Sequence, residues 1–178
     1  MGTDSVTVRP ATGGDFGKIA ALTNRFITDT AIHFAYEPVD AAGLRTSWEK
    51  ARGVYPWLVA EADGVFAGYA KAGVWRDRTA YSWTPEAGIY VEPAVHRRGV
   101  GRLLYGRLID ALRDAGFHSV IGGITLPNDA SVRLHESLGF VKVGHVRHAG
   151  WKLGQWHDVG FWQLALRGGD HEPTLIGR

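Results

Sequence analysis

Residues 89–102 constrain the fold more than any other part of the sequence, because a strand, a glycine turn and a helix start follow one another there. The β-rich run 87–91 ends at Pro93, and Gly99 and Gly101 stand just before an apolar-periodic helix that runs to about residue 115. The backbone N–H groups of such a turn converge where the helix dipole is positive. A pyrophosphate is therefore the natural ligand of this segment.

Three arginines, Arg97, Arg98 and Arg102, adjoin the two glycines. Guanidinium groups donate charge-assisted hydrogen bonds to phosphate oxygens, so these side chains are candidate ligands of a diphosphate or a 3′-phosphate. Glycine spacing alone is a weak signal, and an ordinary turn with solvated arginines fits it equally well. The choice between the two depends on the rest of the chain.

The remaining sequence predicts a single α/β domain. Strand patterns and helix patterns alternate, and Asp63-Gly64 between two strands is typical of a tight hairpin. One strand, helix and strand crossover among hairpin-linked strands indicates a mixed, mostly antiparallel twisted sheet flanked by helices. We expect strands at 6–10, 57–61, 65–72, 87–91, 119–125, 142–148 and 156–165, and further helices at 16–27, 39–52 and 129–138. The domain spans residues 1–167, and the tail 168–178 is predicted to be flexible.

Composition excludes several classes of function. The chain has 178 residues with 45% hydrophobic content, enough for one buried core, and a formal charge of +2, which does not suggest nucleic-acid binding. Cysteine is absent, so disulfides and thiolate ligands are excluded. Without a signal peptide or a membrane-length apolar run, we expect a cytoplasmic protein with no membrane partner.

At two places the sequence resembles the GNAT superfamily of N-acetyltransferases. His96-x-x-Gly99-x-Gly101 is similar to its acetyl-CoA motif, with histidine where glutamine or arginine is usual. Asn128, Ser131 and Glu136-x-x-Gly-Phe are similar to the helix that lies beside the pantetheine arm. The resemblance implies a GNAT-type fold with acetyl-CoA as co-substrate. It implies these cofactor-binding residues: Ile89, Tyr90, Val91, Arg97, Arg98, Gly99, Val100, Gly101, Arg102, Asn128 and Ser131.

A narrower resemblance covers nearly the whole chain up to about residue 166. Segments 9–12, 55–61, 75–84, 126–136 and 156–163 look like phosphinothricin N-acetyltransferases and the related methionine sulfone and sulfoximine acetyltransferases. That similarity implies acetylation of the α-amino group of a small amino-acid analogue, and a homodimer. The aromatic residues Trp151, Trp156, Phe161 and Trp162 are interpreted as core and subunit interface.

Amide formation from a thioester needs a base for the amine proton, donors for the oxyanion and an acid for the thiolate. The resemblance assigns the base to Glu86, directly or through water, and the oxyanion donor to the backbone N–H of Val91 or Tyr90. His135 stands where many GNAT enzymes have the tyrosine that protonates the coenzyme A thiolate. Histidine can also give or take a proton near neutral pH. The alternatives are an exposed turn carboxylate for Glu86 and a hydrogen-bonded core residue for His135.

The resemblance also implies a substrate pocket formed by Phe34, Arg78 and Tyr81, with Arg78 gripping the acceptor's negative group. Arg76 is interpreted as a solvated loop residue. No metal is expected, since His145 and His148 are three apart on a strand and should face opposite sides. Two alternatives stay open: acetylation of a peptide N-terminus or a polyamine, and a non-catalytic acyl-CoA-binding sensor.

Overall fold

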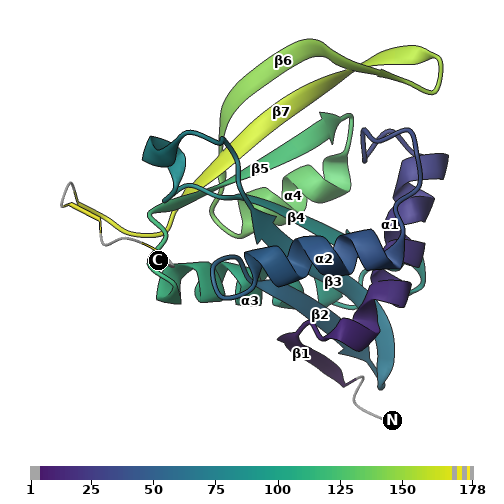
Figure 1. Ribbon diagram of the computed structural model, residues 1–178. Coiled ribbons are helices and arrows are strands. Elements are labelled where there is room, and N and C mark those ends of the chain that lie inside the picture. Colours follow the sequence, from purple (N-terminus) through teal and green to yellow (C-terminus); the bar gives the residue numbers. More distant parts are fainter. Residues whose placement is uncertain (1–4, 170–171, 174–175, 177–178) are drawn as a thin grey trace.

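The computed structural model describes residues 5–169, 172–173 and 176, which form one seven-stranded sheet with helices on both faces (Figure 1). The strand order is β1-β2-β3-β4-β5-β7-β6, and neighbouring strands are antiparallel except β4 and β5. The predicted mixed, mostly antiparallel sheet is confirmed. The strands are β1 (Val6–Pro10), β2 (Trp57–Ala62), β3 (Val65–Gly73), β4 (Glu86–Val91), β5 (Ser119–Leu126), β6 (Val141–Lys152) and β7 (Gln155–Ala165).

Four α-helices and three short 3-10 helices connect these strands in the described part of the chain. The helix α3 crosses from β4 to β5, as the predicted crossover requires. The second helix begins after residue 40 because the Asp40 side chain caps it, accepting a hydrogen bond of 2.6 Å from the Gly43 N–H. The helices are α1 (Phe16–Asp29), α2 (Ala41–Ala51), α3 (Val100–Asp114) and α4 (Asp129–Ser137), with η1 (Gly13–Asp15), η2 (Thr79–Tyr81) and η3 (Pro93–Val95).

Consecutive residues of β2 enter two different cores, which shows that both faces of the sheet are covered. Trp57 and Val59 pack with α1 and α2, whereas Leu58 and Ala60 pack with α3. Successive side chains of a strand point to opposite faces. The helices α1 and α2 therefore cover one face, and α3 with α4 covers the other.

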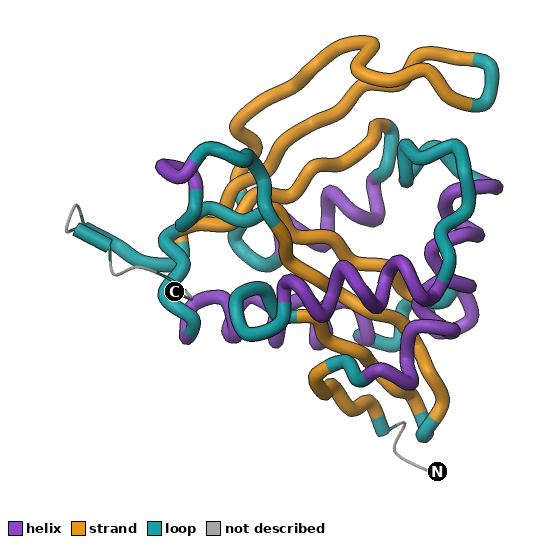
Figure 2. Tube along the Cα trace, in the orientation of Figure 1, coloured by secondary structure: helices purple, strands orange, loops and turns teal. Residues whose placement is uncertain are grey.

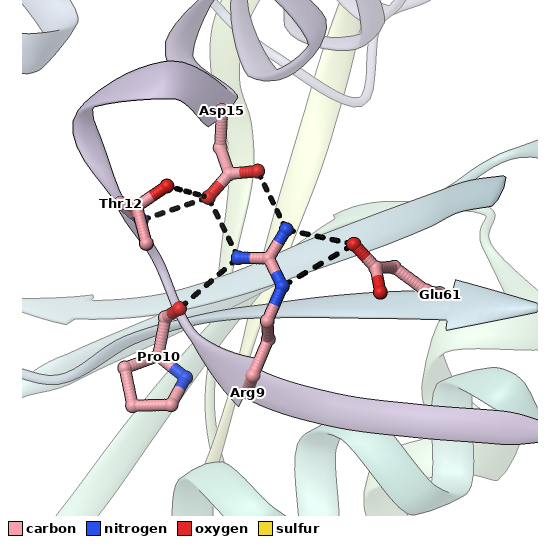
Figure 3. A network of polar contacts seen from close by, with 5 residues as sticks. All are labelled: Arg9, Pro10, Thr12, Asp15 and Glu61. Atoms are coloured by element: carbon pink, nitrogen blue, oxygen red, sulfur yellow. Dashed lines mark hydrogen bonds and ion pairs between the residues drawn. The ribbon is translucent and has the colours of Figure 1, made fainter. Parts of the chain in front are cut away.

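A charged network anchors the first strand to the start of α1 (Figure 3). The Arg9 guanidinium donates two hydrogen bonds of 2.8 Å to the Asp15 carboxylate and two, of 2.7 Å and 3.2 Å, to Glu61 on β2. Asp15 also accepts from the backbone N–H and the hydroxyl of Thr12. These donors, with Arg9 first, hold the pKa of the Asp15 carboxyl well below its usual range. The motif 9–12 is thus structural and lies away from the β4–β5 junction.

The long hairpin β6–β7 reaches past the sheet and over the loop that follows α1 (Figure 2). The predicted strand 142–148 is four residues too short at its end, because an irregularity between Val146 and Gly150 lets β6 continue to Lys152. The Lys152 ammonium is buried and donates hydrogen bonds to the carbonyl oxygens of Ile27 and His33. This lysine ties the hairpin to the loop.

The predicted aromatic cluster divides between the core and the surface. Trp162 is buried, but Trp151 and Trp156 are 50% and 54% exposed on the hairpin, with their rings edge to face at 5.5 Å. Trp151 and Trp156 are therefore not part of the core, and their place in a subunit interface stays a prediction. Their side chains lie beyond the reach of the helices that cover the sheet.

The predicted tail falls partly outside the described residues, which exclude 170–171, 174–175 and 177–178. Within the described part, Ile176 is partly buried against the larger core cluster. No helix among the described residues has the length and hydropathy to cross a membrane. Nor do three His, Asp or Glu side chains of the described chain gather as metal ligands would.

Candidate active site

The strands β4 and β5 separate in the middle of the sheet. In the described chain they pair at a single register position, Glu86 opposite Ile121, and then diverge toward their carboxyl ends (Figure 1). The backbone groups of β4 that would have bonded to β5 face the gap and are available to a ligand. A cavity of about 60 Å³ lies there. Its lining includes five of the predicted site residues, Ile89, Tyr90, Asn128, Ser131 and His135.

The glycine turn lies at the start of α3, as predicted. Gly99 has a φ of 78°, a left-handed conformation that glycine adopts without strain, and Val100 begins the helix. A Cβ atom at Gly99 would meet no other residue within 4 Å, and one at Gly101 would come no closer than 3.7 Å to Leu134. The protein does not fill the space over the turn, which leaves the backbone N–H groups approachable.

The three arginines beside the turn differ in their surroundings. Arg98 donates a hydrogen bond of 2.8 Å to Asp63 in the β2–β3 turn, and Arg102 donates one of 3.1 Å to the carbonyl oxygen of Ser137. Arg97 is exposed. Two of the three guanidinium groups are thus engaged by the protein itself, and their role as phosphate ligands stays a prediction.

A second cavity, of about 380 Å³, opens on the face of the sheet that α1 and α2 cover. Glu86 and Lys71 line it together with three glycines, Gly73, Gly88 and Gly123. The two cavities share Gly88 and Gly123, among other residues. Ligands in the two cavities would therefore meet at the β4–β5 junction, beside the Glu86 carboxylate.

Glu86 is the first residue of β4 and is open to solvent in this cleft. Its carboxyl pKa nevertheless lies above its usual range because the cleft walls displace water, while the charges of Arg76 and Lys71 act in the opposite direction. A carboxylate that binds protons more readily is a better base near neutral pH. The position and chemistry of Glu86 suit a proton acceptor.

His135 is buried on α4, with 3% of its surface exposed. Its Nδ1 lies 2.8 Å from the carbonyl oxygen of Ser131, and its Nε2 lies 3.1 Å from the Tyr105 hydroxyl. A carbonyl can only accept, so Nδ1 carries the hydrogen of the neutral ring and Nε2 accepts that of Tyr105. Burial is the main cause that lowers the pKa of His135 and keeps this neutral form. His135 is therefore a hydrogen-bonded core residue, and it also lies at the lining of the β4–β5 gap.

Two consecutive glycines of β5 let Glu86 and His135 approach the same strand from opposite faces. A Cβ atom at Gly122 would lie 2.5 Å from the Nε2 atom of His135, and one at Gly123 would lie 2.9 Å from the Oε1 atom of Glu86. No side chain fits at either position without displacing its neighbour. The glycine pair therefore brings both predicted catalytic side chains to the β4–β5 junction.

Of the three predicted substrate residues, Arg78 and Tyr81 lie together at η2, whereas Phe34 lies in the loop that follows α1. Phe34 packs against β6 and lies 6.4 Å from the His157 ring, whereas Tyr81 packs edge to face on Trp75 at 5.4 Å. Arg78 is exposed just before η2. None of the three lines the cavity around Glu86. Among the loop arginines, Arg76 is the one whose charge lowers the pKa of Glu86.

Sequence reasoning missed three features of the site. Lys71 gave no signal, because a lysine in an apolar strand is indistinguishable from a surface residue without the pairing of the strands. Tyr105 was concealed within a regular helix. The Gly122-Gly123 pair could have been noticed in the sequence, since glycines inside a strand often mark the close approach of another group to the backbone.

A further cavity of about 560 Å³ lies between η1 and α2 and contains no predicted site residue.

Comparisons with known proteins agree on the kind of protein. Residues 21–140 match the acetyltransferase (GNAT) family. The phosphinothricin N-acetyltransferase of Streptomyces viridochromogenes is 46% identical over 89% of this chain and 86% of its own length. The L-methionine sulfoximine/L-methionine sulfone acetyltransferase of Salmonella typhimurium is 40% identical over 90% and 95%, respectively.

A solved structure shares the fold over nearly its full length. The acetyltransferase of Salmonella typhimurium with its cofactor acetyl-CoA superposes with a TM-score of 0.90, at 37% identity, over 93% of this chain and 96% of that one. The residues matched by the family, 21–140, include β4, α3, β5 and α4.

Proposed function

This chain belongs to the GNAT family of acetyltransferases, and we propose that it moves the acetyl group of acetyl-CoA to the α-amino group of a small amino-acid analogue. Phosphinothricin, methionine sulfoximine and methionine sulfone are the proposed acceptors. The observation that carries the proposal is the meeting of two cavities beside Glu86, one in the β4–β5 gap and one on the opposite side of Gly88 and Gly123. The names of the relatives support the acceptor class.

In the proposed arrangement, the glycine turn and the start of α3 hold the pyrophosphate of acetyl-CoA, and the gap between β4 and β5 receives its pantetheine arm. Asn128 and Ser131 border that gap. The amine enters through the cavity of Glu86 and Lys71. Residues 1–167 form the proposed catalytic domain.

The proposed reaction is a direct attack of the amine nitrogen on the thioester carbonyl. Glu86 takes the amine proton, directly or through water, and the N–H of Val91 or Tyr90 donates to the oxyanion. His135 is the proposed proton source for the departing thiolate. Its Nδ1 hydrogen stays bonded to the Ser131 carbonyl and Nε2 carries no hydrogen in this form, so His135 donates only after Nε2 has taken up a proton from solvent, at the atom that the Tyr105 hydroxyl contacts.

Incubation of the purified protein with acetyl-CoA and each amine, with release of the free thiol as readout, tests this function. We expect turnover with the three amino-acid analogues. Turnover confined to polyamines or peptide N-termini would replace the acceptor class. Acetyl-CoA binding without turnover on any amine would favour the non-catalytic sensor.

We further propose a homodimer, on the support of the apolar side chains that the β6–β7 hairpin exposes. Trp151, Leu153 and Trp156 are each half or more exposed near its tip. Contiguous exposed apolar side chains of this kind mark protein interfaces. We expect sedimentation equilibrium to give twice the chain mass, and a monomeric mass at micromolar concentration would remove this part of the proposal.

A further inference from the structure

Lys71 lies in the cavity of Glu86, and its ammonium donates no hydrogen bond to an oxygen of the described chain. Across the sheet it stands between Trp57 of β2 and Gly88 of β4, and its ammonium lies 4.6 Å from the centre of the Trp57 ring. The side chain is half-buried and lines the same cavity as Glu86. Opposite residues of antiparallel strands share a face, so Lys71 faces the cavity together with Trp57.

Within the described residues the Lys71 ammonium makes no hydrogen bond or ion pair. Burial lowers the pKa of Lys71, and the charge of Glu86 acts in the opposite direction. Lys152 shows the contrast, because its buried ammonium donates to two backbone carbonyl oxygens. An ammonium that has lost water without gaining an oxygen partner is unfavourable. A ligand oxygen in the cavity would supply the hydrogen-bond partner that Lys71 lacks among the described residues.

We propose that Lys71 binds the α-carboxylate of the acceptor amino acid and so selects acceptors that carry one, an inference that rests on the proposed function. One carbon separates the amine of an α-amino acid from its carboxylate, so the cation that binds the carboxylate has to stand close to the base. Glu86 lies opposite Gly73, two residues along β3 from Lys71. Lys71 satisfies this requirement.

The surroundings of Lys71 leave room for that ligand. Gly73, Gly88 and Gly123 line the cavity, and a Cβ atom at Gly73 would meet nothing within 4 Å. Arg78 does not line this cavity, and its exposed position suits the far end of the acceptor, such as a phosphinate. Lys71 would thus bind the α-carboxylate of the acceptor, and Arg78 would bind the end of its side chain.

The experiment compares L-methionine sulfoximine with its carboxamide, in which a neutral amide replaces the α-carboxylate. For Lys71→Met we expect the KM of the acid to rise about 10- to 100-fold with little change in kcat, because an ion-paired hydrogen bond to the ground state is lost. The KM of the carboxamide should stay unchanged. Lys71→Arg should restore most of the preference for the acid.

Lys142→Met is the matched control, because the Lys142 ammonium also lies over a tryptophan, 5.4 Å from the Trp162 ring, but outside the cavity. It should leave both KM values as in the wild type. Equal losses on the acid and the carboxamide would overturn the assignment. A fall in kcat with an unchanged KM would also overturn it, since Lys71 would then act in proton transfer.

Calorimetric titration of each protein with the acid, without acetyl-CoA, separates this inference from the proposed function. If the wild type binds the acid but does not acetylate it, the proposed function fails while Lys71 is still tested by the change in Kd. Weaker binding by Lys71→Met than by Lys142→Met supports the inference. Equal binding by the two variants, or no binding by the wild type, overturns it.

Discussion

Replacing Glu86 by glutamine is expected to lower turnover by about 10²-fold or more, with acetyl-CoA binding preserved. Glutamine keeps the size of the side chain beside Gly123 but cannot take a proton. Binding of acetyl-CoA should survive because the glycine turn and the start of α3 lie at the other end of β4. Thiol release measures turnover, and calorimetry measures acetyl-CoA binding.

The pH dependence of kcat/KM gives a second readout of Glu86. The cleft raises the carboxyl pKa, so the unprotonated base is lost as the pH falls through a value above that of an ordinary glutamate. The wild-type rate should therefore fall on the acid side, and Glu86→Gln should lose this limb. Glu92→Gln is the control, because Glu92 follows β4 and pairs with Arg25 at 2.6 Å, away from the cavity. An unchanged acid limb in Glu86→Gln would remove Glu86 as the base.

Alanine at the two adjacent glycines of β5 is expected to change different properties, with Gly122→Ala lowering stability and Gly123→Ala lowering turnover. At Gly122 the new methyl group would lie 2.5 Å from the His135 ring, which Tyr105 and Phe140 hold in place. Overpacking of this kind costs about 1–3 kcal/mol, which corresponds to a fall in Tm of several degrees in a chain of this size. Thermal unfolding of Gly122→Ala measures this effect.

At Gly123 the methyl group would meet the end of the Glu86 side chain, which is free to turn into solvent. Stability should therefore change by less than about 0.5 kcal/mol, while turnover falls at least about 10-fold as the base moves away. In the Glu86→Gln background, Gly123→Ala should lower turnover little further, since the effects of coupled residues are not additive. A further loss of turnover as large as that in the wild-type background would mean that the methyl group acts by blocking the cavity.

Local chemistry was enough to predict several parts of this protein from its sequence. Asp63 and Gly64 have φ angles of 52° and 77°, the positive values that the Asp-Gly pair predicted. Gly99 takes the left-handed conformation that precedes α3, and Asp40 caps α2. Each of these features depends on interactions within a few residues. The family resemblance likewise depends on short motifs and their order.

For other parts of the site, the sequence identified the residues but not the contacts that they make. Arg98 and Arg102 were expected near phosphate, yet Asp63 and the Ser137 carbonyl engage them across 35 positions of sequence. His135 was left between two interpretations, and its burial against Tyr105 became visible only when α3 and α4 packed on one face. Contacts between distant elements have no signature in local periodicity.

The sequence by itself determined the family, the order of the elements and the turn at the start of α3, because glycines, caps and alternating apolar residues act through nearby backbone. The tertiary structure alone decided which side chains share the cleft. Strand register places Lys71 opposite Gly88, and the separation of β4 from β5 after Glu86 opens the cavities on either side. Register is set by the packing of the whole sheet, so a lysine and a glutamate fifteen positions apart become neighbours only in the folded chain.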